Sequence, residues 1–245
     1  MSTTTTATSG VDTPAKIKID VTSDSICPFC FIGKRKLDRA IEMAKEKGLN
    51  ADFEVEFLPF LLDPTLKEDE PVSKKLRYEQ KFGKERFDSM EAAMIERGKL
   101  NGINFSYGGN VRQTTDSHRL LTLAYEKRGQ IMQADLVEKM FSGYFEQEQD
   151  IGDRDYLTTQ AVAAGLFSSV EEAKNWLATD AKKEEVQQGI LKAQAMGISG
   201  VPFFVFNNKF AISGAEDSEL FVQVFERILG EARAPSKPVS TGQTC

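Results

Sequence analysis

Lys-Ile-Lys-Ile-Asp-Val-Thr-Ser-Asp-Ser-Ile-Cys-Pro-Phe-Cys-Phe-Ile-Gly, residues 16–33, is the stretch of sequence that decides the fold. Polar and apolar residues alternate over 16–22, which predicts a strand. From Pro28 to Lys47 the apolar residues recur at helical spacing instead. The pair Cys27 and Cys30 therefore lies where a strand ends and a helix begins.

The rest of the chain has a helical part between two parts with strand character. Phe53–Leu61 alternates again and predicts a second strand, and two strands joined by a helix favour parallel pairing. Phe203–Phe206 and Lys209–Ile212 predict a hairpin, because Asn207-Asn208 accepts the positive φ of a tight turn. A final helix is expected over Asp217–Leu229. The part between predicts helices at 71–82, 84–100, 115–128, 130–147, 153–164, 169–177 and 180–196.

Without its helical part, the order of elements is β-α-β followed by β-β-α, which is the thioredoxin arrangement. We therefore predict an α/β fold, namely a thioredoxin-like core with a large all-helical insertion. Both ends of the chain are rich in Ser, Thr or Pro and predict disorder. The expected segments are a disordered tail over 1–15, the first half of the core over 16–69, the insertion over 70–196, the second half of the core over 197–230, and a disordered tail over 231–245.

Composition and charge argue against several classes of function. Of the 245 residues, 40% are hydrophobic, which is enough for a core. No apolar run reaches the roughly 18 residues that a membrane helix needs. A net charge of −6 argues against broad nucleic-acid binding. The N-terminus lacks the basic flank and apolar stretch of a secretory signal. We expect a cytoplasmic monomer or homodimer with no membrane or nucleic-acid partner.

The pair Cys27 and Cys30 is the candidate reactive group. Together with Cys245 it makes three cysteines, too few for a disulfide framework. Thiol–disulfide exchange needs one thiolate that attacks and a second thiol that resolves the mixed disulfide. The start of a helix favours the thiolate. We assign Cys27, facing solvent before the first turn, as the nucleophile, and the more buried Cys30 as the resolving thiol.

Two other uses of this cysteine pair stay open at this point, a zinc half-site and a pair of inert core thiols. Zinc needs about four nitrogen or sulfur ligands. Beyond the pair only Cys245, on a tail, and His118, the one histidine, remain as candidate ligands. We therefore expect no metal site.

Three motifs and a closing strand occur in a characteristic order over about residues 16–230. They are Asp24 with Cys27-Pro-Phe-Cys-Phe-Ile-Gly33, then Asp116-Ser-His-Arg-Leu120, then Gly197-Ile-Ser-Gly-Val-Pro-Phe-Phe-Val205, and finally Ile212-Ser-Gly-Ala215. This series resembles the DsbA-like branch of the thioredoxin superfamily, and within it the FrnE-type oxidoreductases. Phe29 departs from the tryptophan usual there, and Gln113 and Thr115 replace the usual asparagine and aromatic residue.

The resemblance implies roles for Val201, Pro202 and His118, and two more residues, Phe29 and Asp24, are candidates because of their positions near the cysteines. Val201–Pro202 would be a cis peptide bond beside the dithiol, and the backbone of Val201 would pair with an extended substrate. His118 would line the substrate pocket and stabilise a thiolate. Phe29, between the two cysteines, would contact the substrate. Asp24 is a candidate proton relay, with a helix-cap or turn role as the alternative.

The expected function is that of a dithiol–disulfide oxidoreductase or isomerase acting on protein or glutathione disulfides. No bound cofactor is expected, and glutathione would serve as a co-substrate. The alternative is a glutathione-dependent transferase or isomerase, like the kappa-class glutathione transferases and 2-hydroxychromene-2-carboxylate isomerases. Those relatives usually carry serine where Cys27 stands, so the cysteine pair favours the first function. A non-catalytic binding protein on the same fold is disfavoured because both cysteines and Pro202 are kept.

Overall fold

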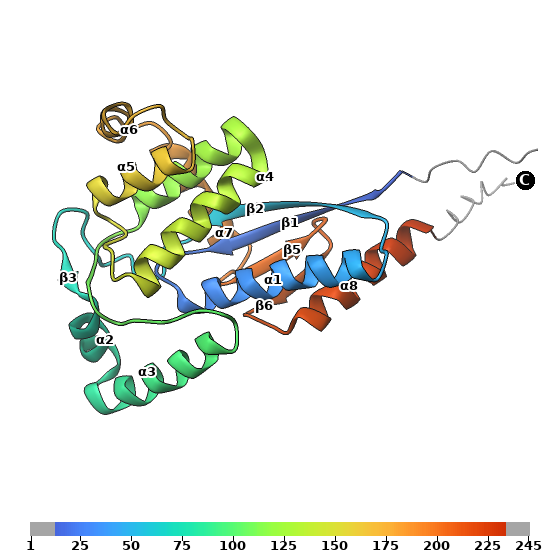
Figure 1. Cartoon of the computed structure of the whole chain (residues 1–245), viewed down its shortest axis with the longest axis horizontal. Helices are drawn as coiled ribbons and strands as arrows, with labels where there is room; N and C mark the ends of the chain where they lie inside the picture. The colour runs from blue at the N-terminus through green and yellow to red at the C-terminus, as the bar shows by residue number, and fades with distance from the viewer. Residues whose placement is uncertain (1–12, 234–245) are drawn as a thin grey trace, which may run out of the picture.

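A four-stranded mixed sheet contains two strands from the N-terminal part of the chain and two from the C-terminal part (Figure 1). The computed structural model describes residues 13–233. The core elements are β1 (Ala15–Ser23), α1 (Pro28–Glu46), β2 (Ala51–Pro59), β5 (Phe203–Phe206), β6 (Phe210–Ser213) and α8 (Ser218–Arg233). The strand order is β2-β1-β5-β6; β1 and β2 are parallel, and the β1–β5 and β5–β6 pairs are antiparallel. The predicted halves, β-α-β and β-β-α, thus share one sheet.

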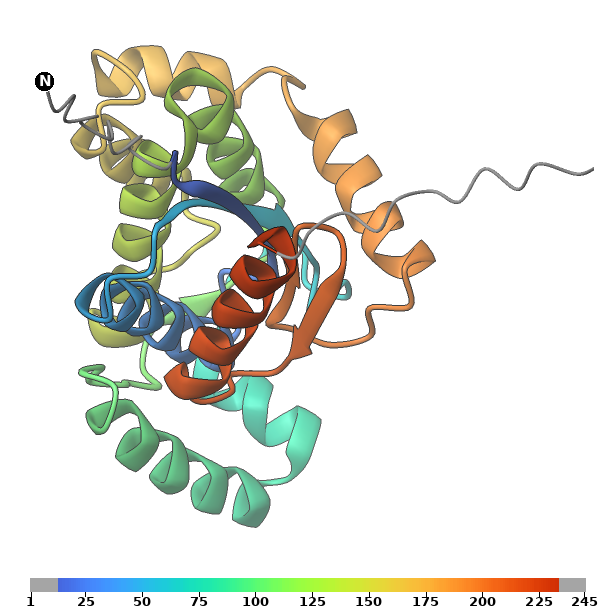
Figure 2. The ribbon, with the colours of Figure 1, turned by 90° about the vertical axis from the view of Figure 1, so that its right-hand side faces the viewer.

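The alternation along β1 explains which face of the sheet the helices cover. Ile17, Ile19 and Val21 are buried. Val21 lies opposite Phe204 of β5, and the Phe204 ring packs at 4.9 Å, centroid to centroid, against Phe221 of α8. The apolar face of β1 therefore points at α8, which lies beside α1 (Figure 2).

The part between the two halves of the core contains six helices and one small pair of strands. The helices are α2 (Lys74–Phe82), α3 (Lys84–Lys99), α4 (Thr115–Glu146), α5 (Arg154–Ala163), α6 (Val170–Leu177) and α7 (Lys183–Ala195). The strands β3 (Val72–Ser73) and β4 (Asn110–Val111) pair antiparallel. The expected large helical insertion is confirmed, and its helices are accompanied by this one pair of two-residue strands, which are too short to show an alternating pattern in the sequence.

The long helix α4 is interrupted at Gly129, where φ is 65°, as the two separate helices of the sequence pattern predicted. Two glutamines that follow the break bind the backbone of β2. Gln130 accepts from the Val55 N–H at 2.7 Å and donates to the Phe53 carbonyl at 2.9 Å. Gln133 makes the same two bonds with the N–H and carbonyl of Phe57, at 2.7 and 2.9 Å. These bonds join the helical part to the sheet.

The ends of the core differ from the predicted boundaries. β1 begins at Ala15, inside the expected tail, because the Ala15 N–H donates to the Asn50 carbonyl at 3.1 Å. The last helix continues through Gly230 to Arg233, and Lys209 pairs with Glu231 beyond the glycine. Residues 1–12 and 234–245 of the tails expected over 1–15 and 231–245, Cys245 among them, lie outside the described residues.

The hairpin between β5 and β6 has the predicted turn. Asn207 and Asn208 both adopt positive φ values, of 48° and 54°. None of the helices within residues 13–233 combines the length and the apolar character needed to cross a membrane.

Candidate active site

The two cysteines stand at the first turn of α1. Cys27 is the N-cap residue, with extended backbone, and Pro28 follows as the first helical residue. Proline suits this position because its missing N–H is not needed for the helix. The Cys30 N–H donates to the Cys27 carbonyl at 3.0 Å, which closes the first turn. The sequence placed both cysteines at this junction, and the structure agrees.

Both cysteines are free thiols, and both are buried. Cys27 is 3% exposed and Cys30 2% exposed. The expectation that Cys27 faces solvent is therefore corrected. Its thiol turns inward and donates to the Val201 carbonyl at 3.4 Å, a contact between residues 174 positions apart. Local sequence around the cysteines does not contain this information.

Burial raises the pKa of the Cys30 thiol well above its usual range, and the neighbouring Cys27 raises it further. Hydrogen bonds from the Ser23 side chain and the Asp24 backbone oppose this shift of the pKa. The Cys30 thiol therefore stays protonated in the dithiol form at neutral pH.

The loop before β5 forms the surface opposite the dithiol. The Val201–Pro202 peptide bond is cis. A Cβ atom at Gly33 of α1 would lie 3.0 Å from Pro202 Cγ, so the helix approaches this loop at a distance that suits glycine. The Val201 N–H makes no hydrogen bond to another residue of 13–233. Val201 thus presents an unpaired donor beside Cys27.

Phe29 lies between the cysteines with its ring at the surface. The residue is 38% exposed. Its ring centroid is 5.8 Å from the guanidinium carbon of Arg97 in α3. The ring of Phe29 is therefore accessible at the surface between the two cysteines, and its contact with a substrate stays a prediction.

His118 and Asp24 lie inside the protein and contact each other, with 3.5 Å between His118 Nε2 and Asp24 Oδ1. His118 donates from Nε2 to the Phe60 carbonyl at 2.9 Å. Asp24 accepts from the Leu62 N–H at 2.6 Å and from the Ile26 N–H at 3.4 Å. His118 is only 3% exposed, and its role in lining a substrate pocket stays a prediction. Of the two roles considered for Asp24, these contacts match the turn role.

The mid-chain motif contacts the dithiol loop through side chains that no sequence pattern predicted. The hydroxyl groups of Ser25 and Ser117 lie 2.9 Å apart. On the other side of the motif, the fully buried Arg119 donates to the carbonyls of Leu177, Thr179 and Ala181, at 3.2, 2.6 and 2.7 Å. The motif itself was visible in the sequence, but its role in joining α4 to two loops depends on contacts distant along the chain.

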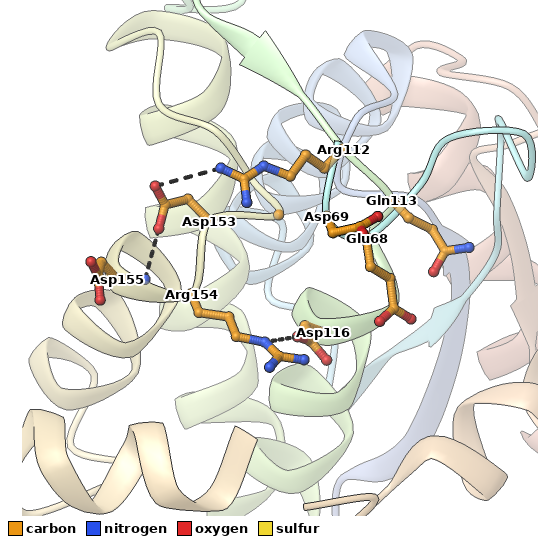
Figure 3. A pocket seen from close by; sticks show the side chains of 9 residues that line it. Glu68, Asp69, Arg112, Gln113, Asp116, Asp153, Arg154 and Asp155 are labelled. Atoms are coloured by element: carbon orange, nitrogen blue, oxygen red, sulfur yellow. Dashed lines mark hydrogen bonds and ion pairs between the residues drawn. The ribbon is translucent and has the colours of Figure 1, made fainter. Parts of the chain in front are cut away.

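A charged cleft of about 410 Å³ lies at the start of α4 (Figure 3). Asp116 accepts there from Arg119 at 2.6 Å and from Arg154 at 2.8 Å, and Arg112 pairs with Asp150 at 2.8 Å. Neither cysteine lines this cleft. Within residues 13–233, no cluster of three or more His, Cys, Asp or Glu side chains is arranged to hold a metal ion.

The chain is similar in sequence or in structure to several known proteins. The Bacillus subtilis protein YwbO, which is uncharacterized, is 28% identical over 223 residues, covering 84% of this chain and 94% of YwbO. The crystal structure of a probable DsbA oxidoreductase from Streptomyces coelicolor is 29% identical, with a TM-score of 0.79, covering 92% of this chain and 94% of that one. The cytosolic disulfide reductase DsbM from Pseudomonas aeruginosa, solved with glutathione, is 14% identical, with a TM-score of 0.59 and coverage of 88% and 98%.

The family described as DSBA-like thioredoxin domain matches residues 18–226, which include the dithiol, the helical part and the loop with Pro202. The order of elements and the mixed sheet found here are those of a thioredoxin core with helices inserted between its halves. The chain belongs to the DSBA-like thioredoxin domain family.

Proposed function

We propose that this protein is a thiol–disulfide oxidoreductase in which Cys27 attacks the substrate and Cys30 resolves the mixed disulfide. The observation that carries the proposal is the 3.4 Å contact between the Cys27 thiol and the Val201 carbonyl. It brings a thiol at a helix N-terminus next to a backbone segment with an unpaired N–H. A nucleophile and a place to hold an extended substrate thus meet at one point.

In the reducing direction, the Cys27 thiolate attacks one sulfur of the substrate disulfide. A Cys27–substrate bond forms, the substrate S–S bond breaks, and the released thiolate takes up a proton. Cys30 then loses its proton and attacks the Cys27 sulfur. The Cys27–Cys30 disulfide forms and the second substrate thiol leaves, so that two electrons have passed to the substrate. Oxidation of a substrate dithiol is the same sequence in reverse.

The surroundings of Cys30 support this order of events. Burial and the nearby Cys27 both raise the pKa of Cys30. Once Cys27 is bonded to a substrate sulfur, it is no longer a neighbouring charge, and the second of these causes is removed. Cys30 then ionises more readily, at the stage when it has to attack.

Val201 would hold the substrate during exchange. Its carbonyl accepts from the Cys27 thiol in the dithiol form. When Cys27 ionises or bonds to substrate sulfur, this carbonyl is released and, together with the Val201 N–H, pairs with substrate backbone as an added strand does. Phe29, half-exposed beside the sulfurs, would cover one side of the substrate.

We further propose that the reaction takes place in the cytoplasm on protein or glutathione disulfides, with glutathione as a co-substrate. DsbM, which is similar in fold, is a cytosolic disulfide reductase that was solved with glutathione. A glutathione-dependent transferase or isomerase needs only one activating group at the position of Cys27. The second thiol of Cys30, one turn along the helix, favours exchange instead.

Redox titration against glutathione, followed by thiol trapping and intact mass, tests this function. We expect Cys27 and Cys30 to be oxidised or reduced together, so that the protein loses or gains two hydrogens in a single transition. Cys27→Ser should abolish disulfide reduction, whereas Cys30→Ser should accumulate a mixed disulfide, and Cys245→Ser is the matched control that keeps activity. Full activity of either dithiol variant would rule out the two-thiol mechanism.

A further inference from the structure

A small void lies beside the resolving thiol, between the end of β1, the loop before the cysteines, β2 and α4. Its volume of about 10 Å³ is close to the roughly 10–15 Å³ that one water molecule needs. Three polar side chains line it, those of Ser23, Ser25 and His118. The rest of the wall is apolar, with Phe57, Leu121, Val137, Met140 and Phe141. A water in this void would have three polar partners, the usual number for a buried water.

Ser23 connects the void to the resolving thiol. The Ser23 side chain is hydrogen-bonded to the Cys30 sulfur, and both residues are buried. Cys30 has to lose a proton before it attacks Cys27, yet it is only 2% exposed, so bulk water has little access to it. The Ser23 hydroxyl offers this proton a route, because a hydroxyl group both accepts and donates hydrogen bonds.

His118 is the proton acceptor on the other side of the void. Its Nε2 donates to the Phe60 carbonyl at 2.9 Å, which leaves the lone pair of Nδ1 as an acceptor in the neutral ring. Nδ1 makes no hydrogen bond to another residue of 13–233. Imidazole is the side chain best suited to take up and release protons near neutral pH.

The neighbouring hydroxyl groups determine the direction of the hydrogen bonds. The Ser117 hydroxyl donates to the Thr114 carbonyl at 2.8 Å, so in its 2.9 Å contact with Ser25 it accepts and Ser25 donates. The Ser25 oxygen therefore offers only lone pairs to the void. A water there would donate one hydrogen to Ser25 and the other to His118, and would accept from Ser23.

We propose that His118 accepts the proton of Cys30 during resolution, through the Ser23 hydroxyl and one water in this void. The inference rests on the proposed function and supplies the proton acceptor that resolution requires. The Cys30 proton passes to the Ser23 oxygen, the Ser23 proton to the water, and a water proton to His118 Nδ1. The electron pair stays on the Cys30 sulfur, which then attacks Cys27. The leaving substrate thiolate takes up a proton and the imidazolium releases one to solvent, so the overall balance is unchanged.

Asp24 stabilises the charge that this transfer places on His118. Its carboxylate is fully buried and lies 3.5 Å from His118 Nε2. A buried cation is tolerated where it has such a partner. Asp24 contacts Cys30 through its backbone, and its carboxylate does not line the void. The imidazole, rather than this carboxylate, is therefore the group that the proton reaches.

The other charged groups on the elements around His118 are paired with one another. The pairs are Asp116 with Arg119, Asp63 with Arg77, and Glu138 with Lys34. Burial raises the pKa of the Tyr144 hydroxyl well above its usual range, so this group stays neutral. Among the described residues that line the void, His118 alone can gain a proton near neutral pH.

The test measures the two exchange steps separately, in the full chain carrying Cys245→Ser so that only the dithiol reacts. The reduced protein is mixed with excess dithiobis(nitrobenzoic acid), which releases one yellow thiolate when Cys27 attacks and a second when Cys30 resolves. The first phase depends on reagent concentration and the second does not. At pH 7 we expect His118→Gln to slow the second phase about 100-fold, as for loss of proton transfer by a side chain, with the first phase changed less than about twofold.

Two further variants locate the proton path. Glutamine at position 118 keeps a donor for the Phe60 carbonyl but has no basic nitrogen. Ser23→Ala interrupts the path and should also slow the second phase. Thr122→Val is the matched control, because the Thr122 hydroxyl donates to the His118 carbonyl at 2.9 Å but does not line the void. Both phases should keep their rates in this control.

The pH profile distinguishes proton transfer from a change in structure. With His118 in place the proton goes to the ring, so the second phase should stay constant between about pH 7.5 and 9. In His118→Gln the proton goes to hydroxide, so the second phase should rise about tenfold per pH unit. A variant that only distorts the site would keep the pH dependence of the wild type, and that result would contradict the proton path.

If His118→Gln does not fold, the profile of the protein with His118 is the second measurement. A constant second phase supports the path, and a second phase proportional to hydroxide overturns it. Equal second phases with and without His118, or slowing of the first phase alone, would also overturn the inference and leave the proposed function intact. Release of a single thiolate by the protein with both cysteines would overturn the proposed function itself, and the inference with it.

Discussion

Lys74 makes the stability of the fold depend on pH. Its side chain is 0% exposed. The ammonium donates to the carbonyls of Tyr144 and Ser106, at 2.7 and 3.2 Å, and lies 4.1 Å from the centroid of the Tyr144 ring. Burial lowers the pKa of Lys74 from 10.5 to about 8, with the charge of Glu148 opposing the shift. The folded protein therefore releases this proton more easily than the unfolded chain.

The sign of the effect follows from proton binding. Below pH 8 both states carry the proton, and the folded state bears the cost of burying the charge. Between pH 8 and the unfolded pKa of 10.5, the unfolded chain binds more protons, so the free energy of unfolding rises with pH. With these two pKa values, the gain from pH 7 to pH 9.5 is about 2 kcal/mol.

Urea unfolding of the wild type and of Lys74→Met at pH 7, 8, 9 and 9.5 measures this gain. The free energy of unfolding of the wild type, minus that of the variant, should increase by about 2 kcal/mol over this range. Tyrosines and Cys30 also titrate at high pH, but they do so in both proteins and cancel in the difference. Lys75→Met, at an exposed lysine next in sequence, should show no such trend. A difference between wild type and Lys74→Met that stays constant with pH would refute the reasoning.

Three further predictions concern the core and the chain end. Gly33→Ala places a methyl group 3.0 Å from the ring of Pro202. Overpacking costs about 1–3 kcal/mol and the higher helix propensity of alanine returns about 1 kcal/mol, so the free energy of unfolding should fall by about 1 kcal/mol and thiol–disulfide exchange should slow. Gly230→Ala, where the new methyl group meets open space, should instead raise the free energy of unfolding. Gln133→Leu leaves buried backbone groups of β2 unpaired and should lower the free energy of unfolding in urea by about 2–4 kcal/mol. Gln188→Leu, at an exposed glutamine, is the control and should change it by less than about 0.5 kcal/mol. Truncation after Arg233 removes Cys245 and should leave glutathione-disulfide reduction near the wild-type rate; a large loss would assign that thiol a part in the cycle.

The sequence predicted best those features that depend on neighbouring residues. The alternation before Cys27 and the helical spacing after it placed the dithiol at a strand–helix junction, and Gly129 marked the break in α4. In contrast, the burial of Cys27 depends on Val201, which lies 174 residues away. The buried position of His118 likewise depends on the carbonyl of Phe60 in a distant loop.

Very short strands could not be predicted from the sequence either. Strands β3 and β4 have two residues each, so no period can be read from them. They exist because residues far apart in the chain meet: the Lys74 N–H donates to the Gly109 carbonyl at 3.0 Å, next to the paired residues Ser73 and Asn110.

The two glutamines of α4 have a consequence for self-association. An open strand edge is a template on which another chain can add a strand, and amyloid-like stacking begins in this way. β2 is one edge of the sheet, and the side-chain amides of Gln130 and Gln133 occupy its hydrogen-bonding groups at Phe53, Val55 and Phe57. A helix thus seals this side against strand addition. Within the described sheet, growth by a further strand is left to β6, a strand of four residues, whose length limits how firmly a second chain could attach.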